Sequence, residues 1–312
     1  MDYLLFLLLL PFAWACIRLL TSGLVGWNSV SPTLPPGPHP FPIIGNILEL
    51  GNKPHQTVAE LSKTYGPLMT LKLGSITTIV ISSPKIAKEA LQRNDQAFSC
   101  RTILDIARPF DHHKFSVAWL PTNGHWRILR KVSAMQIFAP QRLDATQGLR
   151  RRKVQELLDH VNQSCNRGVA VDIGRDVFTT ILNSISNTFF SIDLAQYGSN
   201  LSQEFQKLIT GLAEEAGRPN LADYFPALRL VDPQGARRRS RIYYEKLFGM
   251  LDGFINERVQ LRASSKGPKA SNDVLDSLLT VTEEDNSDLS CHDIKHLLLV
   301  IDYLFKTFLR NT

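Results

Sequence analysis

The sequence predicts a mainly α fold of the α+β class, in which one small β-hairpin precedes a long helical body. Residues 69–73 alternate apolar and polar, and residues 77–81 are rich in β-branched side chains, which indicates a hairpin turning at Gly74-Ser75. Beyond Pro121 the apolar residues recur almost everywhere at helical spacing. The 312 residues are 44% hydrophobic and 21% charged. That composition suits a chain with a large core and excludes disorder, collagen and coiled coil as global descriptions.

The amino terminus predicts a membrane-anchor helix within residues 1–27. Residues 3–17 are an unbroken apolar run, and the apolar residues after Arg18 extend it to roughly the 20 that span a bilayer. Arg18 lies off centre, where its long stem can carry the charge to the headgroups. Two alternatives remain open, a buried core helix and a cleaved signal peptide ending near Ala13-Trp14-Ala15. Asp2 stands in a region where a signal peptide carries Lys or Arg, which favours a retained anchor.

Residues 28–46 are a Pro-rich linker, with five prolines between positions 35 and 42. Because Pro fixes φ and lacks a backbone donor, the segment predicts a stiff, polyproline-like arm between the anchor and the body. A simple spacer and a ligand for a proline-binding module are the alternatives. The remaining residues, 47–312, are predicted to form one mixed domain without an internal repeat.

The helices of the body are separated by clusters of Gly, Pro and Asn. Ser83-Pro84 predicts the start of an early helix, and its buried stripe consists of Ile86, Ala87, Ala90 and Leu91. The later helices are expected at residues 124–137, 143–166, 172–190, 202–216, 234–262, 272–282 and 291–309.

Charge and cysteine content restrict the classes of partner. The net charge of +6 is mild for this length and suits an acidic partner or an anionic membrane surface. The basic runs at 150–153 and 237–241 lack interleaved aromatic residues, so solvated helix faces are expected and nucleic acid is not. Four widely separated cysteines without a C-x-x-C pair favour a reducing environment over a zinc site or a disulfide framework.

Trp126 and Arg130 are the strongest candidates for contact with a ligand. They lie four positions apart and so share one face of a helix, and both side chains donate hydrogen bonds without accepting them. Together they suit a pair of carboxylates such as haem propionates, while the alternative is a buried Trp beside a solvated Arg. His112-His113 could suggest a metal site, but adjacent loop histidines rarely chelate together, so solvated side chains are expected there.

Several motifs, in this order, resemble the N-terminal half of a plant microsomal cytochrome P-450. They are residues 34–46, the hairpin region 65–82, Phe98-Ser99-Cys100-Arg101, residues 116–121 before Trp126-Arg127, Asp223-Tyr224-Phe225-Pro226 and Asp232-Pro233-Gln234-Gly235. The resemblance covers about residues 34–299 and is greatest to the group that includes geraniol hydroxylases and diterpene hydroxylases. It implies the N-terminal part of the cytochrome P-450 fold and a haem b cofactor. It further implies hydroxylation of a small apolar, terpenoid-like substrate by O₂, with electrons from a NADPH-cytochrome P-450 reductase.

The resemblance also implies roles for individual residues. Trp126 and Arg130 match the helix that binds the haem propionates. Residues 103–117 match a loop that faces substrate, and Leu208 begins a segment that resembles the lid over the access channel. The candidate substrate contacts are Ile103, Leu104, Phe110, Phe115 and Leu208, and core packing is the alternative for the four that lie in the loop. Membrane lipid is a further implied partner, in a single-pass protein of the endoplasmic reticulum whose body lies on the cytoplasmic side.

No residue of this chain matches the family's catalytic or iron-binding motifs. The axial thiolate of a haem-thiolate enzyme belongs to the motif F-x-x-G-x-R-x-C-x-G, and none of the four cysteines, Cys16, Cys100, Cys165 and Cys291, has that context. Glu215 and Arg218 have the family's E-x-x-R spacing in the wrong region, and residues 300–312 depart from the expected A-G-x-D-T-T. The expectation is therefore a truncated, inactive form without a metal ligand. The alternative class is a non-catalytic, membrane-tethered helical binding protein.

Overall fold

The computed structural model describes residue 11 and residues 34–197, 200–264, 273–283 and 289–299. The chain divides into two compact units, Met1–Lys88 and Glu89–Thr312, and each is described by itself. The predicted anchor lies outside the described residues apart from position 11. Within the described ranges, no helix combines the length and the apolar character needed to cross a membrane.

The predicted hairpin is confirmed in the first unit. Strands β1 (Leu68–Leu73) and β2 (Ile76–Ile81) pair antiparallel, with Leu68 opposite Ile81 and Leu73 opposite Ile76. Successive side chains of a strand point to opposite faces. Met69 and Leu71 are accordingly buried, while the polar residues between and beside them remain partly exposed.

The described part of the Pro-rich linker is non-helical, as expected, and contacts the hairpin. The backbone N–H of Thr70 donates to the Pro36 carbonyl at 2.9 Å, and Gly45 forms a β-bridge with Leu73. Gly45 has a φ of +64°, and a Cβ atom there would lie 2.0 Å from the carbonyl oxygen of Lys72. Only glycine allows this approach. The role of the linker as an arm between anchor and body stays a prediction.

Short helices complete the first unit and open the second. η1 (Ile47–Leu50), α2 (Pro54–Tyr65) and α3 (Pro84–Lys88) belong to the first unit. The second begins with a π-helix, η2 (Glu89–Arg93), followed by α4 (Asp95–Phe98). Leu91 is exposed, so the predicted buried stripe is wrong at this residue. The wider turn of a π-helix rotates Leu91 off the face expected for 3.6 residues per turn.

The second unit is predominantly helical, which confirms the predicted fold class. From residue 124 onward its elements are α6 (Gly124–Gln136), α7 (Pro140–Ala145), α8 (Gln147–Asn166), α9 (Ile173–Phe190), α10 (Asn200–Gly217), α11 (Leu221–Tyr224), η5 (Pro226–Leu230), α12 (Ala236–Ser264) and α13 (Val274–Glu283). The single helix expected at 143–166 is instead α7 and α8, divided at Thr146. Residues 291–299 are helical, and the predicted continuation to 309 lies outside the described residues.

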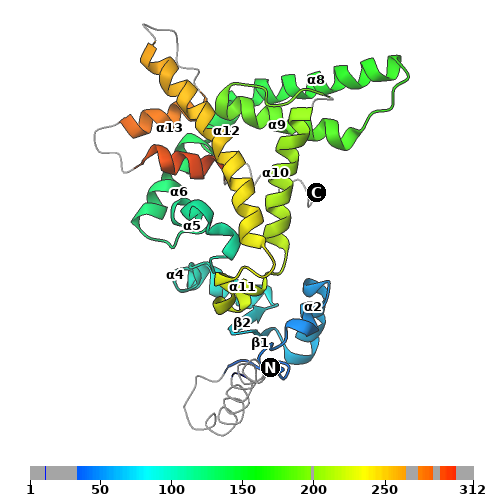
Figure 1. Ribbon diagram of the computed structural model, residues 1–312, viewed down its shortest axis with the longest axis vertical. Coiled ribbons are helices and arrows are strands. Elements are labelled where there is room, and N and C mark those ends of the chain that lie inside the picture. The colour runs from blue at the N-terminus through cyan, green and yellow to red at the C-terminus, as the bar shows by residue number, and fades with distance from the viewer. Residues whose placement is uncertain (1–10, 12–33, 198–199, 265–272, 284–288, 300–312) are drawn as a thin grey trace, which may run out of the picture. The chain divides into compact units, whose positions relative to one another are not determined.

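The apolar core of the second unit is enclosed by α6, α9, α10, α12, α13 and the 291–299 helix. Fully buried side chains come from separate helices, such as Leu129 of α6, Leu278 of α13 and Leu297 of the 291–299 helix. Figure 1 shows α10 and α12 side by side.

Candidate functional site

The helix α6 carries both predicted haem-edge residues. Asn123 caps it, since its side-chain oxygen accepts from the backbone N–H of Trp126 at 2.9 Å. Arg130 is exposed and makes no hydrogen bond or ion pair with the described residues. Trp126 is half-buried, and its indole Nε1–H donates to the carbonyl of Val117 at 3.0 Å. The guanidinium of Arg130 is therefore available to an anionic ligand, whereas the indole N–H of Trp126 is bonded to the segment that precedes α6.

Trp126 and Arg130 are suited to contact the propionates at the edge of a haem, but neither can serve as the thiolate ligand of its iron. Arg130 supplies the charged donor that a propionate requires. A haem-thiolate centre also needs a cysteine in an enclosed pocket, but Cys100, Cys165 and Cys291 are all exposed, and Cys16 lies outside the described residues. The proposed contact of Trp126 and Arg130 with haem propionates stays a prediction.

The loop predicted to face substrate folds into three short helical turns. They are η3 (Asp105–Ala107), η4 (Pro109–Asp111) and α5 (His112–Phe115). Ile103, Leu104 and Phe115 are half-buried, and Phe110 is exposed. The Phe110 ring meets Phe248 of α12 edge-on, with ring centroids 5.7 Å apart. The loop thus packs on α12, and its contact with substrate stays a prediction.

His112 is buried, so the expectation of a solvated loop histidine is wrong for this residue. Its Nδ1 lies 2.8 Å from Nδ1 of His296, and Nε2 of His296 lies 3.1 Å from Nε2 of the exposed His292. Phe115 stacks on His296, and Phe248 meets His296 edge-on. These aromatic neighbours remove the imidazoles from water, and a partner on the 291–299 helix satisfies the hydrogen bonding of His112.

Burial lowers the pKa of both His112 and His296 to about 3. Loss of hydration disfavours the charged imidazolium, and His113 and His292 add repulsion between like charges. Both imidazoles are therefore neutral at physiological pH. In a neutral pair, one Nδ1–H donates and the other Nδ1 accepts, so the pair is a directed hydrogen bond inside an aromatic cluster.

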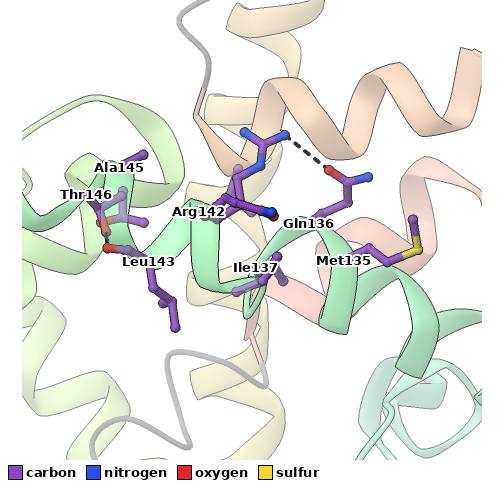
Figure 2. A pocket seen from close by; sticks show the side chains of 11 residues that line it. Met135, Gln136, Ile137, Arg142, Leu143, Ala145 and Thr146 are labelled. Atoms are coloured by element: carbon purple, nitrogen blue, oxygen red, sulfur yellow. Dashed lines mark hydrogen bonds between the residues drawn. The ribbon is translucent and has the colours of Figure 1, made fainter.

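Leu208 of α10, the remaining candidate contact, is buried within the apolar core of the second unit. A surface pocket of about 360 Å³ lies elsewhere, where the end of α6 meets α7. Figure 2 shows Arg142 donating to Gln136 beside Met135 at this pocket. None of the predicted site residues lines it.

The basic runs are solvated in part, as expected, since Arg150, Arg151, Arg152, Arg238 and Arg241 are exposed, but three of their residues bind carboxylates. Arg239 binds the buried carboxylate of Glu215 through two hydrogen bonds, of 2.8 and 2.7 Å. Arg237 binds the buried carboxylate of Asp105, and Lys153 is buried against carboxylates that include Asp193. Carboxylates distant in sequence compensate these charges, which a local count of Lys and Arg does not reveal.

Sequence reasoning missed Asp105, Asp223 and His296 as members of the site. Asp105 stands between the apolar residues Leu104 and Ile106, and an isolated acid in such a run is a signal for a buried cationic partner. The backbone N–H of Asp105 donates to the Asp223 carboxylate at 2.6 Å. Asp223 lies in one of the motifs that carry the family resemblance, but its partner is 118 residues away.

Comparison with known proteins agrees with the motifs. The family model described as cytochrome P-450 matches residues 35–302. Cytochrome P-450 76T24 of Catharanthus roseus is 48% identical over 298 residues, covering 96% of this chain and 59% of that protein. Geraniol 8-hydroxylase of the same plant is 46% identical, covering 96% of this chain and 59% of its own length. Ferruginol synthase of Salvia miltiorrhiza is 44% identical, covering 85% and 54%.

The chain thus spans little more than half the length of these relatives. The match covers both the hairpin and the helical unit, with α6 and the loop before it inside the matched residues. This chain belongs to the cytochrome P-450 family.

Proposed function

We propose that this chain is part of a haem-thiolate monooxygenase that hydroxylates a small apolar, terpenoid-like substrate. Its similarity to geraniol 8-hydroxylase over 96% of the chain is the observation that supports this proposal best. Arg130 would bind a haem propionate, and the loop at 103–117 would form part of the substrate side. The haem would supply oxygen activation, with O₂ as oxidant and a NADPH-cytochrome P-450 reductase as electron donor.

We further propose that residues 1–27 anchor the protein in the endoplasmic reticulum, with the body on the cytoplasmic side. The unbroken apolar run at 3–17 and the absence of Lys or Arg before it support this proposal. Protease treatment of sealed microsomes is expected to digest the body. Protection of the body, or a mature protein that begins after Ala15, would contradict this topology.

The 312 residues alone are proposed not to turn over substrate, because none of their cysteines has the sequence context of the axial ligand. The test is to supply the chain with haem, reductase, NADPH and geraniol. We expect neither the long-wavelength Soret band of a reduced carbon-monoxide complex nor a hydroxylated product. A stoichiometric thiolate spectrum with turnover would overturn this part of the proposal.

The monooxygenase proposal itself is tested by sequencing the gene downstream of the region that encodes this chain and by assaying the product. We expect the genomic reading frame downstream of the Leu299 codon to encode F-x-x-G-x-R-x-C-x-G, and its product to give the thiolate spectrum and to hydroxylate a terpenoid. Arg130→Gln removes a charge-assisted hydrogen bond of about 1.5–3 kcal/mol and should weaken haem retention roughly 10- to 150-fold. Arg127→Gln, an exposed neighbour on α6, is the control. A frame without the motif would favour the membrane-tethered binding protein instead.

A further inference from the structure

Asp105 ties the start of the substrate-side loop to α12. Its side chain has an exposure of 0%, and its carboxylate accepts two hydrogen bonds from Arg237, one of them from Nε at 3.0 Å. Arg108, on the loop itself, is a weaker partner, with Nε 3.6 Å from the carboxylate. A fully buried carboxylate needs such a partner because burial without one carries a large desolvation cost. Arg237 is therefore what allows Asp105 to stay buried.

A second contact fixes the same point of the loop from α11. The Asp105 backbone N–H donates to the Asp223 carboxylate at 2.6 Å. Two acidic residues thus meet below the surface, and burial raises the pKa of Asp223. Their mutual repulsion increases the need for a cation, which α12 supplies through Arg237.

The backbone that follows is strained. Phe110 and Asp111 have φ values of +55° and +54°, a left-handed conformation that bulky residues rarely adopt. Such strain persists only where surrounding contacts hold it. The contacts that hold this segment include the Phe110 ring against Phe248 and the His112–His296 pair, and the Trp126 indole fixes the end of the loop. Release of Asp105 would remove the support at the start of the strained segment.

We propose that Arg237 is a positioning residue that holds residues 105–112 packed against α12. It thereby fixes the position of one wall of the proposed substrate-binding site. The role of this wall in substrate binding rests on the proposed function. The ion pair between Arg237 and Asp105, called the latch below, rests on the observed contacts alone. An apolar substrate offers neither residue a competing partner. The latch would therefore remain closed as substrate binds and set the shape that the substrate meets.

Hydrogen exchange of the full chain, read by mass spectrometry, tests the latch without haem. Arg237→Gln is expected to speed exchange at the amides of 106–108 and 110–112 by about tenfold or more, because it leaves a buried charge uncompensated. The matched control is Arg238→Gln, the exposed neighbour on α12, which should stay within about twofold of wild type. Equal rates in the two variants would overturn the proposal, as would an equal acceleration across α8 and α9, which indicates global destabilisation.

Two further variants separate the charge pair from general packing. Asp105→Asn combined with Arg237→Gln removes both charges, so exchange at 106–112 should return toward the wild-type rate. Arg237→Lys keeps the charge but not the paired hydrogen bonds and should fall between wild type and Arg237→Gln. Failure of the double variant to slow exchange relative to Arg237→Gln would overturn the latch.

The role of Arg237 in substrate binding is tested separately, by measuring KM on the enzyme that the complete reading frame encodes. Arg237→Gln should raise KM for geraniol at an unchanged reduced carbon-monoxide absorbance, because substrate must then order the loop as it binds. An unchanged KM would overturn the role in the substrate wall. Absence of the thiolate spectrum in the wild-type product would instead be the failure of the proposed function, and the exchange result would be unaffected by it.

Discussion

Acidification is expected to destabilise the second unit through His112 and His296. Each has a folded pKa of about 3 against an ordinary value of 6.5. Below pH 6.5 the unfolded chain takes up protons that the folded chain does not bind. Stability is therefore complete above pH 6.5 and is lost as the pH falls toward 3.

The size of the effect follows from the two pKa values. A difference of about 3.5 between them corresponds to roughly 5 kcal/mol for one histidine, or about 1.4 kcal/mol per pH unit. The two imidazoles are hydrogen-bonded through their Nδ1 atoms, 2.8 Å apart, so their titrations are coupled and the loss for the pair is not simply twice that of one group. Of the other charged groups nearby, His113, His292 and Lys295 oppose protonation, whereas Asp293 favours it.

Urea unfolding followed by circular dichroism between pH 7.5 and 4.5 measures this slope. His112→Phe keeps an aromatic ring against Tyr244 and Phe248 but removes one titrating group. It should reduce the slope by about 1.4 kcal/mol per pH unit. His55→Gln, at an exposed histidine of the first unit, is the control and should leave the slope unchanged. The reasoning is refuted if wild type and His112→Phe lose stability in parallel as the pH falls.

Three substitutions test the packing inside each of the two units. Gly45→Ala brings a Cβ to 2.0 Å from a backbone oxygen, whereas Gly51→Ala meets nothing within 4 Å at a similar φ. Hydrogen exchange of β1 should therefore accelerate markedly more for Gly45→Ala, and equal effects would contradict the close approach. The guanidinium of Arg258 lies 2.8 Å from the buried carboxylates of both Asp273 and Asp276 at the start of α13. Arg258→Ala should therefore lower the free energy of unfolding, measured in urea, by about 3–5 kcal/mol. A loss below about 1 kcal/mol would show that these charges are solvated. Leu275 has an exposure of 0%, and Leu275→Ala should cost about 2–5 kcal/mol. Leu230→Ala, at a side chain that is 94% exposed, should change stability by less than about 0.5 kcal/mol.

The sequence by itself determined the elements and the family. The hairpin, the helical body and most helix bounds follow from hydrophobic spacing, Pro and Gly positions and capping residues, which act between neighbours along the chain. The motifs around Trp126 and those near Asp223 identify the family without reference to any tertiary contact. The predicted burial of Leu91 is wrong because spacing along a helix does not reveal a π-turn.

Only the tertiary structure decided how the charged and polar residues are partnered. Arg237 and His112 were expected in solvent, yet each meets a buried partner more than 130 residues away in the sequence. The indole N–H of Trp126 donates to the carbonyl of Val117, a partner that the sequence pattern does not indicate. Hydrophobic burial follows a local period, whereas a buried charge or imidazole is stable only beside the particular group that satisfies it. That group is brought into place by the packing of helices that the sequence pattern describes only one at a time.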